Sequence, residues 1–264
     1  MPIPSPVPLP IRALAAACAL AWVLAWALGA AGAARAQQAD GPAATTYITE
    51  QYYPYSYTAD GTVRGLSADL LRLVWRHMGV AEQPIQVQPW ARAYEAGRTR
   101  PGTVVFGMAR TPGRERLFKW ACPIDTVRFA LFARAADKAR ILVSADMKTL
   151  VVGTVRDDVA EAALLETARP VRIEPVADME LNLRKLDAGR LDLVAYEARS
   201  MPRLLRSLGR DPAGYAEVIP LSETDTCYAF HRDTADEVVA RFQRALDAVR
   251  AGPEYARLRR LYLE

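Results

Sequence analysis

The stretch TVVFGMARTPGRERLFKWACPI, Thr103–Ile124, indicates the fold class of this chain. Its first six residues, Thr103–Met108, form a short apolar run, and such a run bounded by turn residues predicts a buried strand rather than a helix. Thr111-Pro112-Gly113 then ends the strand, because proline has no N–H for the sheet and glycine adopts backbone angles that other residues avoid. Phe118 and Trp120 return the chain to an apolar environment.

Two basic residues, Arg110 and Arg114, flank this turn. Ligands of open α/β sheets bind outside the carboxyl ends of the strands, so guanidinium groups at this place predict an anion clamp. The alternative is an ordinary solvated turn, because arginines in loops are common and mostly exposed. The spacing alone leaves both interpretations open.

Residues 1–36 are typical of a signal peptide. Arg12 precedes the apolar run Ala13–Ala34, and Ala34-Arg35-Ala36 supplies the small residues that a signal peptidase requires. We expect cleavage after Ala36, a periplasmic mature protein and a disordered linker over residues 37–44. A transmembrane anchor is the competing interpretation, but the run is rich in alanine and weakly apolar, which favours removal.

The composition is that of a globular protein of small net charge. The chain has 264 residues, of which 51% are hydrophobic, and a mean hydropathy of −0.03. Removing the two arginines of residues 1–36 from the 34 basic residues leaves 32 against 30 acidic residues, a net charge of +2 instead of +4. The arginines are spread over the chain without a basic stripe, so we expect no nucleic-acid partner.

The predicted mature chain keeps two cysteines, Cys122 and Cys227. An exported protein meets an oxidising compartment, which allows a disulfide between them. Two buried thiols are the alternative, because the sequence does not show whether the two Cα atoms lie within bridging distance.

Strand and helix patterns alternate along most of the chain, which predicts parallel βαβ packing. A tyrosine-rich segment, Tyr52–Tyr57, follows the first strand and is expected to line a groove in part, because each buried hydroxyl needs a partner. The predicted strands are Thr45–Thr49, Ile85–Val87, Thr103–Met108, Thr126–Arg134, Leu150–Val155, Val171–Glu174, Leu191–Tyr196, Val218–Leu221 and Cys227–Phe230. The predicted helices are 67–78, Ala91–Ala96, Asp158–Ala168, Met179–Ala188, Ser200–Leu208, Ala235–Ala251 and Tyr255–Leu263.

Two α/β units joined by two extended crossings, 126–134 and about 224–230, predict a bilobal protein with a ligand cleft between its lobes. We expect lobe 1 to consist of residues 45–128 and 225–264, and lobe 2 of residues 129–224. Glu197 stands just past the last strand of the second unit, so the rule applied to Arg114 places it at a ligand-facing edge as well.

In this order, several segments resemble the amino-acid type (family 3) of periplasmic solute-binding proteins from ABC importers. The resemblance implies a type II periplasmic-binding-protein fold, with two α/β lobes, two hinge strands and a cleft. It covers nearly all of the mature chain. The segments that carry it are Tyr53–Tyr57 with Gly61 and Gly65–Asp69, then Thr111–Arg114 with Phe118 and Cys122-Pro123, then Leu186, Gly189, Asp192 and Glu197, and finally Ala251–Tyr262.

The resemblance also implies roles for single residues. Arg114 is similar to the family arginine that holds a ligand carboxylate, with Thr111 beside it, and Glu197 resembles the acid that pairs with the ligand ammonium. Tyr52 resembles the aromatic residue that covers the ligand side chain, and Trp90 is the candidate for the opposite wall.

The chain departs from the family pattern at two places. Ala109 and Arg110 replace the usual serine region before Thr111, and Arg156-Asp157-Asp158 replaces a Gly-Thr-Thr-like turn. Asp158 is expected to cap its helix, whereas Arg110 and Arg156 are candidates that add positive charge to the cleft. The departures predict another small acid or zwitterion as ligand, beside an α-amino acid.

We therefore expect a monomeric periplasmic binding protein that passes a small polar or charged solute to the permease of an ABC importer. It is expected to need no cofactor or metal and to catalyse no reaction, because no catalytic triad and no metal-ligand spacing is found. The alternative is an exported dehydratase that acts on a cyclic carboxylate on the same scaffold, with Glu197 as general acid. No sequence feature favours a third class, a sensor module.

Overall fold

Eight strands form one mixed sheet in the part of the chain that the computed structural model describes, residues 45–143, 149–166 and 171–264. The predicted signal peptide and linker lie outside these residues. The order across the sheet is β4-β1-β5-β10-β6-β9-β7-β8, and β2 and β3 form a separate hairpin. The strands are β1 (Thr46–Thr49), β2 (Tyr57–Ala59), β3 (Thr62–Arg64), β4 (Ile85–Val87), β5 (Thr103–Ala109), β6 (Phe118–Arg134), β7 (Val151–Val155), β8 (Arg172–Val176), β9 (Leu193–Glu197) and β10 (Tyr215–His231).

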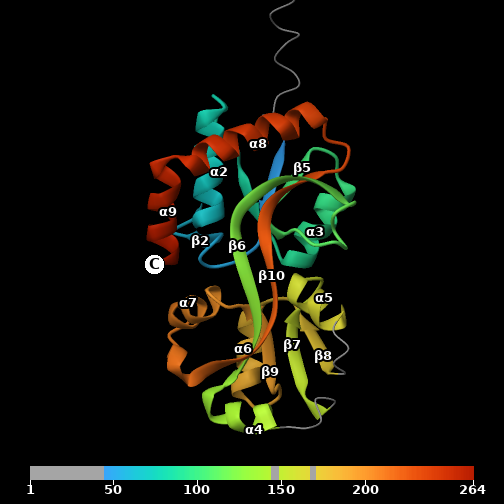
Figure 1. Cartoon of the computed structure of the whole chain (residues 1–264), viewed down its shortest axis with the longest axis vertical. Helices are drawn as coiled ribbons and strands as arrows, with labels where there is room; N and C mark the ends of the chain where they lie inside the picture. Colours follow the sequence, from blue (N-terminus) through green and yellow to red (C-terminus); the bar gives the residue numbers. More distant parts are fainter. Residues whose placement is uncertain (1–44, 144–148, 167–170) are drawn as a thin grey trace, which may run out of the picture. The chain divides into compact units, whose positions relative to one another are not determined.

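The sheet consists of two parallel halves joined by two long antiparallel strands. In the first half, β1 is parallel to both β4 and β5, and in the second half β7 is parallel to both β8 and β9. β6 and β10 run side by side between the halves (Figure 1). β5 pairs with the end of β10, and β9 pairs with the second part of β6. The observed architecture confirms the predicted α/β fold class.

In Figure 1 α2, α3, α8 and α9 lie beside the first half of the sheet, and α5, α6 and α7 lie beside the second half. α2, α8 and α9 contact one another, α3 contacts β1 and β5, and α5, α6 and α7 contact β7 and β9 in different combinations. The helices are α2 (Leu66–His77), α3 (Trp90–Thr99), α4 (Lys138–Val143), α5 (Val159–Glu166), α6 (Met179–Asp187), α7 (Ser200–Ser207), α8 (Asp236–Ala251) and α9 (Pro253–Leu263), with short 3-10 turns at Ala135–Asp137 and Pro212–Gly214.

The two long strands differ from the prediction. We expected a strand from Thr126 and two separate short strands near residues 218 and 227, whereas β6 and β10 contain 17 residues each. The intervening polar residues do not alternate with apolar ones. They are nevertheless paired in register, for example Ser222 with Phe129 and Thr224 with Val127. Backbone pairing with the partner strand therefore extends both strands beyond what side-chain patterns indicate.

The residue before α2 lies in close contact with the tyrosine-rich segment that follows β1. Gly65 precedes the helix with a φ of 116°, and a Cβ at this position would lie 2.4 Å from the carbonyl oxygen of Tyr55. Only glycine allows so close an approach. Within the helix Leu71, Val74 and Trp75 are fully buried at helical spacing.

Cys122 and Cys227 form a disulfide, with their Cα atoms 4.7 Å apart. The alternative of two free thiols is therefore wrong. The bond links β6 to β10 beside the register shift between Thr226 and Tyr228. It ties together the two strands that join the halves of the sheet.

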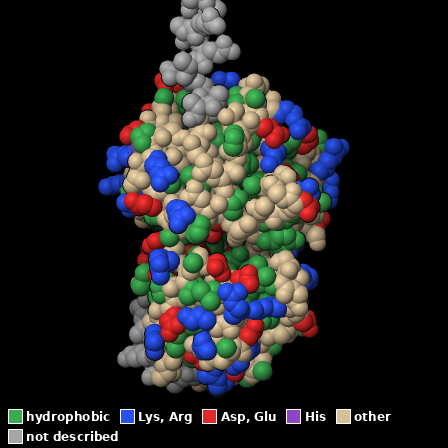
Figure 2. Space-filling view, turned by 180° about the vertical axis from the view of Figure 1, so that it is seen from behind, with side chains coloured by type: hydrophobic (Ala, Val, Ile, Leu, Met, Phe, Trp, Pro, Cys, Tyr) green, Lys and Arg blue, Asp and Glu red, His purple; other side chains and the backbone are tan. Residues whose placement is uncertain are grey.

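The remaining global features agree with a globular protein. Among the described residues, no helix is both long enough and apolar enough to cross a membrane. On the face that Figure 2 shows, basic and acidic side chains are interspersed. Such mixing is typical of a globular surface with a small net charge.

Candidate functional site

A cavity of about 430 Å³ lies where the carboxyl ends of strands from both halves of the sheet meet. The loops after β1, β4, β5 and β7 supply much of its wall, and Phe129 of β6 and Thr226 of β10 add to it. This place is the ligand-binding edge of an open α/β sheet. The wall includes the ionisable or large aromatic side chains of Glu50, Tyr52, Trp90, Arg114, Asp158 and Tyr196.

Arg114 is buried in the cavity wall, with only 6% of the residue exposed. Its backbone N–H donates to the carbonyl of Thr111 at 3.0 Å, which closes the predicted turn. The guanidinium donates to the carbonyl oxygen of Ala109 from Nη1 at 3.4 Å and to that of Asp157 from Nη2 at 2.7 Å. Burial lowers the pKa of Arg114, and the nearby Asp158 opposes this shift.

The aromatic rings of Trp90 and Tyr94 lie beside the guanidinium of Arg114. The Cζ atom of Arg114 lies 5.1 Å from the centroid of each ring, within the range of cation–π attraction. The indole Nε1 of Trp90 donates to the same Asp157 carbonyl oxygen at 2.8 Å. One backbone oxygen from the loop after β7 thus accepts two hydrogen bonds from the first half of the sheet.

Two carboxylic acids share the cavity with Arg114. Glu50 follows β1 directly, and Asp158 stands at the start of α5, where its Oδ1 accepts the N–H of Val159 at 2.6 Å. Burial and the charge of Asp158 raise the pKa of Glu50 well above its ordinary value, and Arg114 opposes this shift. Burial also raises the pKa of Asp158, again against the effect of Arg114. The cavity therefore disfavours two ionised carboxylates at once.

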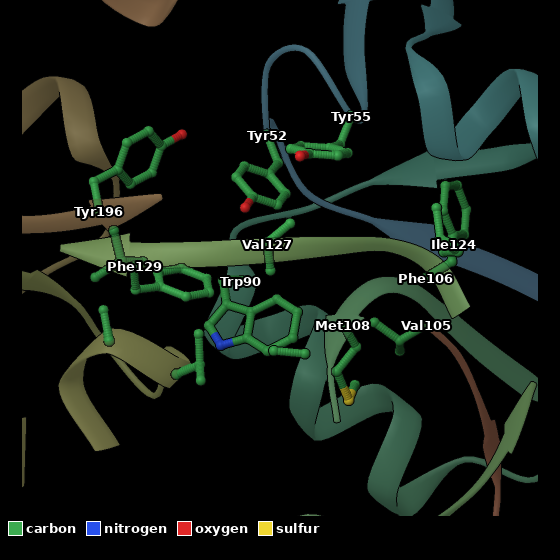
Figure 3. Packing of buried hydrophobic residues seen from close by; sticks show 14 of the residues in the cluster. Tyr52, Tyr55, Trp90, Val105, Phe106, Met108, Ile124, Val127, Phe129 and Tyr196 are labelled. Carbon is green, nitrogen blue, oxygen red and sulfur yellow. The ribbon is translucent and has the colours of Figure 1, made fainter. Parts of the chain in front are cut away.

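Aromatic rings form another part of the wall. Figure 3 shows Tyr52, Trp90, Phe129 and Tyr196 arriving from four different elements around the middle of β6. The rings of Tyr52 and Tyr196 are 6.1 Å apart and meet edge to face. The hydroxyl of Tyr52 is buried, and among the described residues it has no hydrogen-bond partner.

The sequence model of the bacterial extracellular solute-binding proteins, family 3, matches residues 45–264. The chain belongs to this family. Its membership confirms the resemblance that the motifs indicated, and the match spans all of the residues that the structure describes. This chain is thus a solute-binding protein.

Solved structures share the fold of this solute-binding protein at low sequence identity. A periplasmic binding protein of Salmonella typhimurium with high arginine specificity has a TM-score of 0.70 and 20% identity, over 83% of this chain and 99% of its own. An amino acid ABC transporter substrate-binding protein of Streptococcus pneumoniae, bound to L-arginine, has a TM-score of 0.72 and 14% identity, over 83% and 94%.

A third structure is an ancestral amino acid-binding protein described as a precursor of cyclohexadienyl dehydratase. Its TM-score is 0.69 at 17% identity, and the match covers 84% of this chain and 96% of that one. Among curated protein sequences none matches this solute-binding protein. The structural likenesses establish a periplasmic-binding-protein-like fold of type II, which is the fold that the resemblance implied.

Of the seven candidate site residues, three line the main cavity of the solute-binding protein: Tyr52, Trp90 and Arg114. Arg110 and Thr111 line a different cavity of about 160 Å³ beside α5. Arg110 is paired there with Glu115, from Nε at 2.8 Å and Nη2 at 2.6 Å. Arg156 is exposed and is not among the residues that line either cavity.

Glu197 also lies away from the main cavity. Its carboxylate is buried and accepts the backbone N–H of Arg199 at 3.0 Å and of Ser200 at 2.6 Å, at the start of α7. It lines a separate polar cavity of about 360 Å³. Glu197 thus accepts two backbone N–H groups where α7 begins, and its predicted role as partner of the ligand ammonium stays a prediction.

The sequence interpretation missed Glu50 and Tyr196, and treated Asp158 only as a helix cap. Glu50 comes directly after the predicted strand Thr45–Thr49, so the rule that places residues at carboxyl ends would have found it. Tyr196 gave no such signal, because an apolar strand end is expected to be buried in the core.

Proposed function

We propose that the cavity at Arg114 is the solute site of this family member and that it binds a small zwitterionic solute of the amino-acid type. The observation that carries the proposal is the presence of opposite charges in the wall of one cavity. Arg114 provides a positive pole, and Glu50 with Asp158 provides a negative pole. Such a site fits a ligand that carries both a carboxylate and an amine.

Closure around the solute is part of this proposal. Lobe 1 comprises residues 45–128 and 225–264, lobe 2 comprises residues 129–224, and β6 with β10 acts as the hinge. The origin of the wall residues supports it, because Arg114 and Glu50 follow strands of the first half of the sheet and Asp158 follows a strand of the second. A solute that contacts all three side chains draws the halves together.

Export and delivery complete the proposal. A signal peptide, residues 1–36, is removed after Ala36, and the monomeric protein carries its solute through the periplasm to the permease of an ABC importer. The family match and the fold shared with an ABC transporter substrate-binding protein support this assignment.

The dehydratase alternative rests on the structural neighbour described as a dehydratase precursor. The acid proposed for its chemistry, Glu197, is engaged with two backbone N–H groups and lines a different cavity. A general acid must reach the proton-accepting atom of its substrate. Reversible binding without turnover is therefore the function that we favour.

The test is a calorimetric titration of the purified full chain with amino acids of each charge class, small dicarboxylates and aliphatic amines. We expect at least one of these solutes to bind with a dissociation constant in the micromolar range or below. Arg114→Ala should weaken the binding of solutes that carry a carboxylate, whereas Arg116→Ala, an exposed neighbour in the same segment, should preserve it. Amino-acid affinity that Arg114→Ala leaves unchanged, or prephenate turnover by the wild type, would contradict the proposal.

A further inference from the structure

The charges of the cavity wall are not balanced. Three acidic residues, Glu50, Asp158 and Asp178, face one basic residue, Arg114. Asp178 is exposed and its Oδ1 caps α6 by accepting the N–H of Leu181 at 2.8 Å. Glu50 and Asp158 are both half-buried, and desolvation disfavours the ionised form of each.

Arg114 is already engaged by the protein itself. Each of its two Nη atoms donates to a backbone carbonyl, one to Ala109 and one to Asp157. A ligand carboxylate that binds both Nη atoms must compete with these two hydrogen bonds. The bond to Asp157, at 2.7 Å, has the length of a charge-assisted hydrogen bond. The positive pole is thus largely satisfied by the fold.

Glu50 differs from Arg114 in this respect. Within the part of the chain that the structure describes, no hydrogen bond to its carboxylate is found, and its neighbours are the acid Asp158 and the already bonded Arg114. A ligand cation near Glu50 stabilises both ionised carboxylates at once. A charge without a partner in a half-buried wall is costly, so this contact is the one that ligand binding improves most.

The aromatic wall favours the same ligand charge. Tyr52, Trp90 and Tyr196 line the cavity that holds Glu50, and ring faces attract ammonium and guanidinium groups. The aliphatic wall residues Val87 and Met179 suit the methylene groups of such a ligand.

We propose that the cavity selects its ligand by an organic cation held at Glu50, Asp158 and the aromatic rings, and that a ligand carboxylate is dispensable. Primary amines and guanidines that lack a carboxylate are then ligands, beside amino acids with a cationic side chain. This proposal rests on the proposed function, because it concerns the same solute site.

The test compares ligand pairs that differ only by the carboxylate, titrated calorimetrically into the purified full chain at pH 7.5. The pairs are L-arginine with agmatine and L-lysine with cadaverine, and L-citrulline serves as an uncharged analogue of the arginine side chain. We expect at least one carboxylate-free amine to bind within tenfold of its parent amino acid. We also expect L-citrulline to bind at least tenfold more weakly than L-arginine.

Each of these two expectations can fail, and so contradict the inference, while the proposed function still holds. If both amines bind more than tenfold more weakly than their parent amino acids, or L-citrulline binds as well as L-arginine, the cation is not the selected group. The proposed function fails on a different result, namely that neither these solutes nor the wider panel of amino acids binds at all.

Single substitutions in the cavity wall test whether the ligand cation binds at Glu50 and Asp158. Glu50→Gln and Asp158→Asn should each weaken agmatine at least tenfold, while Glu237→Gln, which removes an exposed acid on α8, should leave the affinity unchanged. Melting temperatures of the three variants report whether they are folded. Unchanged agmatine affinity in folded Glu50→Gln and Asp158→Asn would contradict the proposal.

Discussion

Arg114 donates a hydrogen bond from Nη2 to the backbone carbonyl oxygen of Asp157 at 2.7 Å. Arg114 follows β5 and Asp157 follows β7, so this bond joins the two halves of the sheet at the cavity. Asp157 has a φ of 61°, in the left-handed region that most side chains avoid. Because the acceptor is a main-chain atom, substitution of the Asp157 side chain leaves the bond in place.

Replacing Arg114 should lower the stability of the protein as well as its ligand affinity. Arg114→Ala removes charged donors from two carbonyl oxygens and a cation from two rings, so we expect a loss of about 2–4 kcal/mol in the free energy of unfolding. Urea denaturation measures it. Arg116→Ala is the control, with an expected change within about 0.5 kcal/mol because the side chain is exposed. Equal stability of the two variants would argue against this role.

The disulfide should contribute more than any single contact of the site. Cys122 and Cys227 are separated by 105 residues, and a bond that closes so long a loop stabilises by about 2–5 kcal/mol. We expect the double variant Cys122→Ser/Cys227→Ser to lose that amount in urea denaturation. Dithiothreitol should destabilise the wild type but not the double variant, and sensitivity of the variant to the reductant would contradict the assignment.

Glu197 is expected to matter for stability rather than for ligand binding. Glu197→Ala removes the acceptor for two N–H groups at the start of α7, which costs about 0.5–2 kcal/mol. Glu197→Gln keeps an oxygen acceptor and should lose less. Calorimetry should find the solute affinity of both variants within about threefold of the wild type. If Glu197→Gln weakens only ligands that carry an ammonium group, the role inferred from the sequence holds instead.

The contribution of Glu50 to stability should fall as the pH rises above the ordinary pKa of glutamate. A carboxyl whose pKa is raised by folding holds its proton more tightly in the folded state than in the unfolded state. Its stabilising effect is complete below the ordinary glutamate pKa of about 4.3 and is lost as the pH passes the raised pKa of Glu50. Glu50→Gln should therefore flatten this fall, as melting temperatures across a pH series would show. A fall of the same size in Glu50→Gln and Glu237→Gln would exclude Glu50 as its source.

Cation binding should release protons from the site. A ligand cation favours the ionised forms of Glu50 and Asp158, whose pKa values burial raises, so the affinity for agmatine should increase with pH and level off above those values. Titration calorimetry in two buffers of different ionisation enthalpy measures the number of protons released. No dependence of the binding enthalpy on the buffer at weakly acidic pH would count against this coupling.

Much of the fold follows from local patterns, because short apolar strands and amphipathic helices alternate along the chain. The run Thr103–Met108 became β5, with one further residue. The lengths of β6 and β10 could not be predicted, because partners distant in sequence supply the backbone pairing.

The site was predicted less completely than the fold. The rule that ligands bind at the carboxyl ends of strands predicts the edge of the sheet at which a residue lies, but not the direction of its side chain. Successive strand residues point to opposite faces. Tyr196 lines the main cavity and its neighbour Glu197 therefore faces the other one. Arg110 and Arg114 both follow β5, yet Arg114 lines the cavity while Arg110 pairs with Glu115.

The position of β10 between β5 and β6 bears on how the chain matures. β5 can pair with β10 only when residues 226–230 have been synthesised. Thr226 of this segment also lines the solute cavity. A nascent polypeptide that stops short of this strand lacks the central neighbour of β5 and part of the cavity wall. Solute capture therefore requires that synthesis has passed these residues.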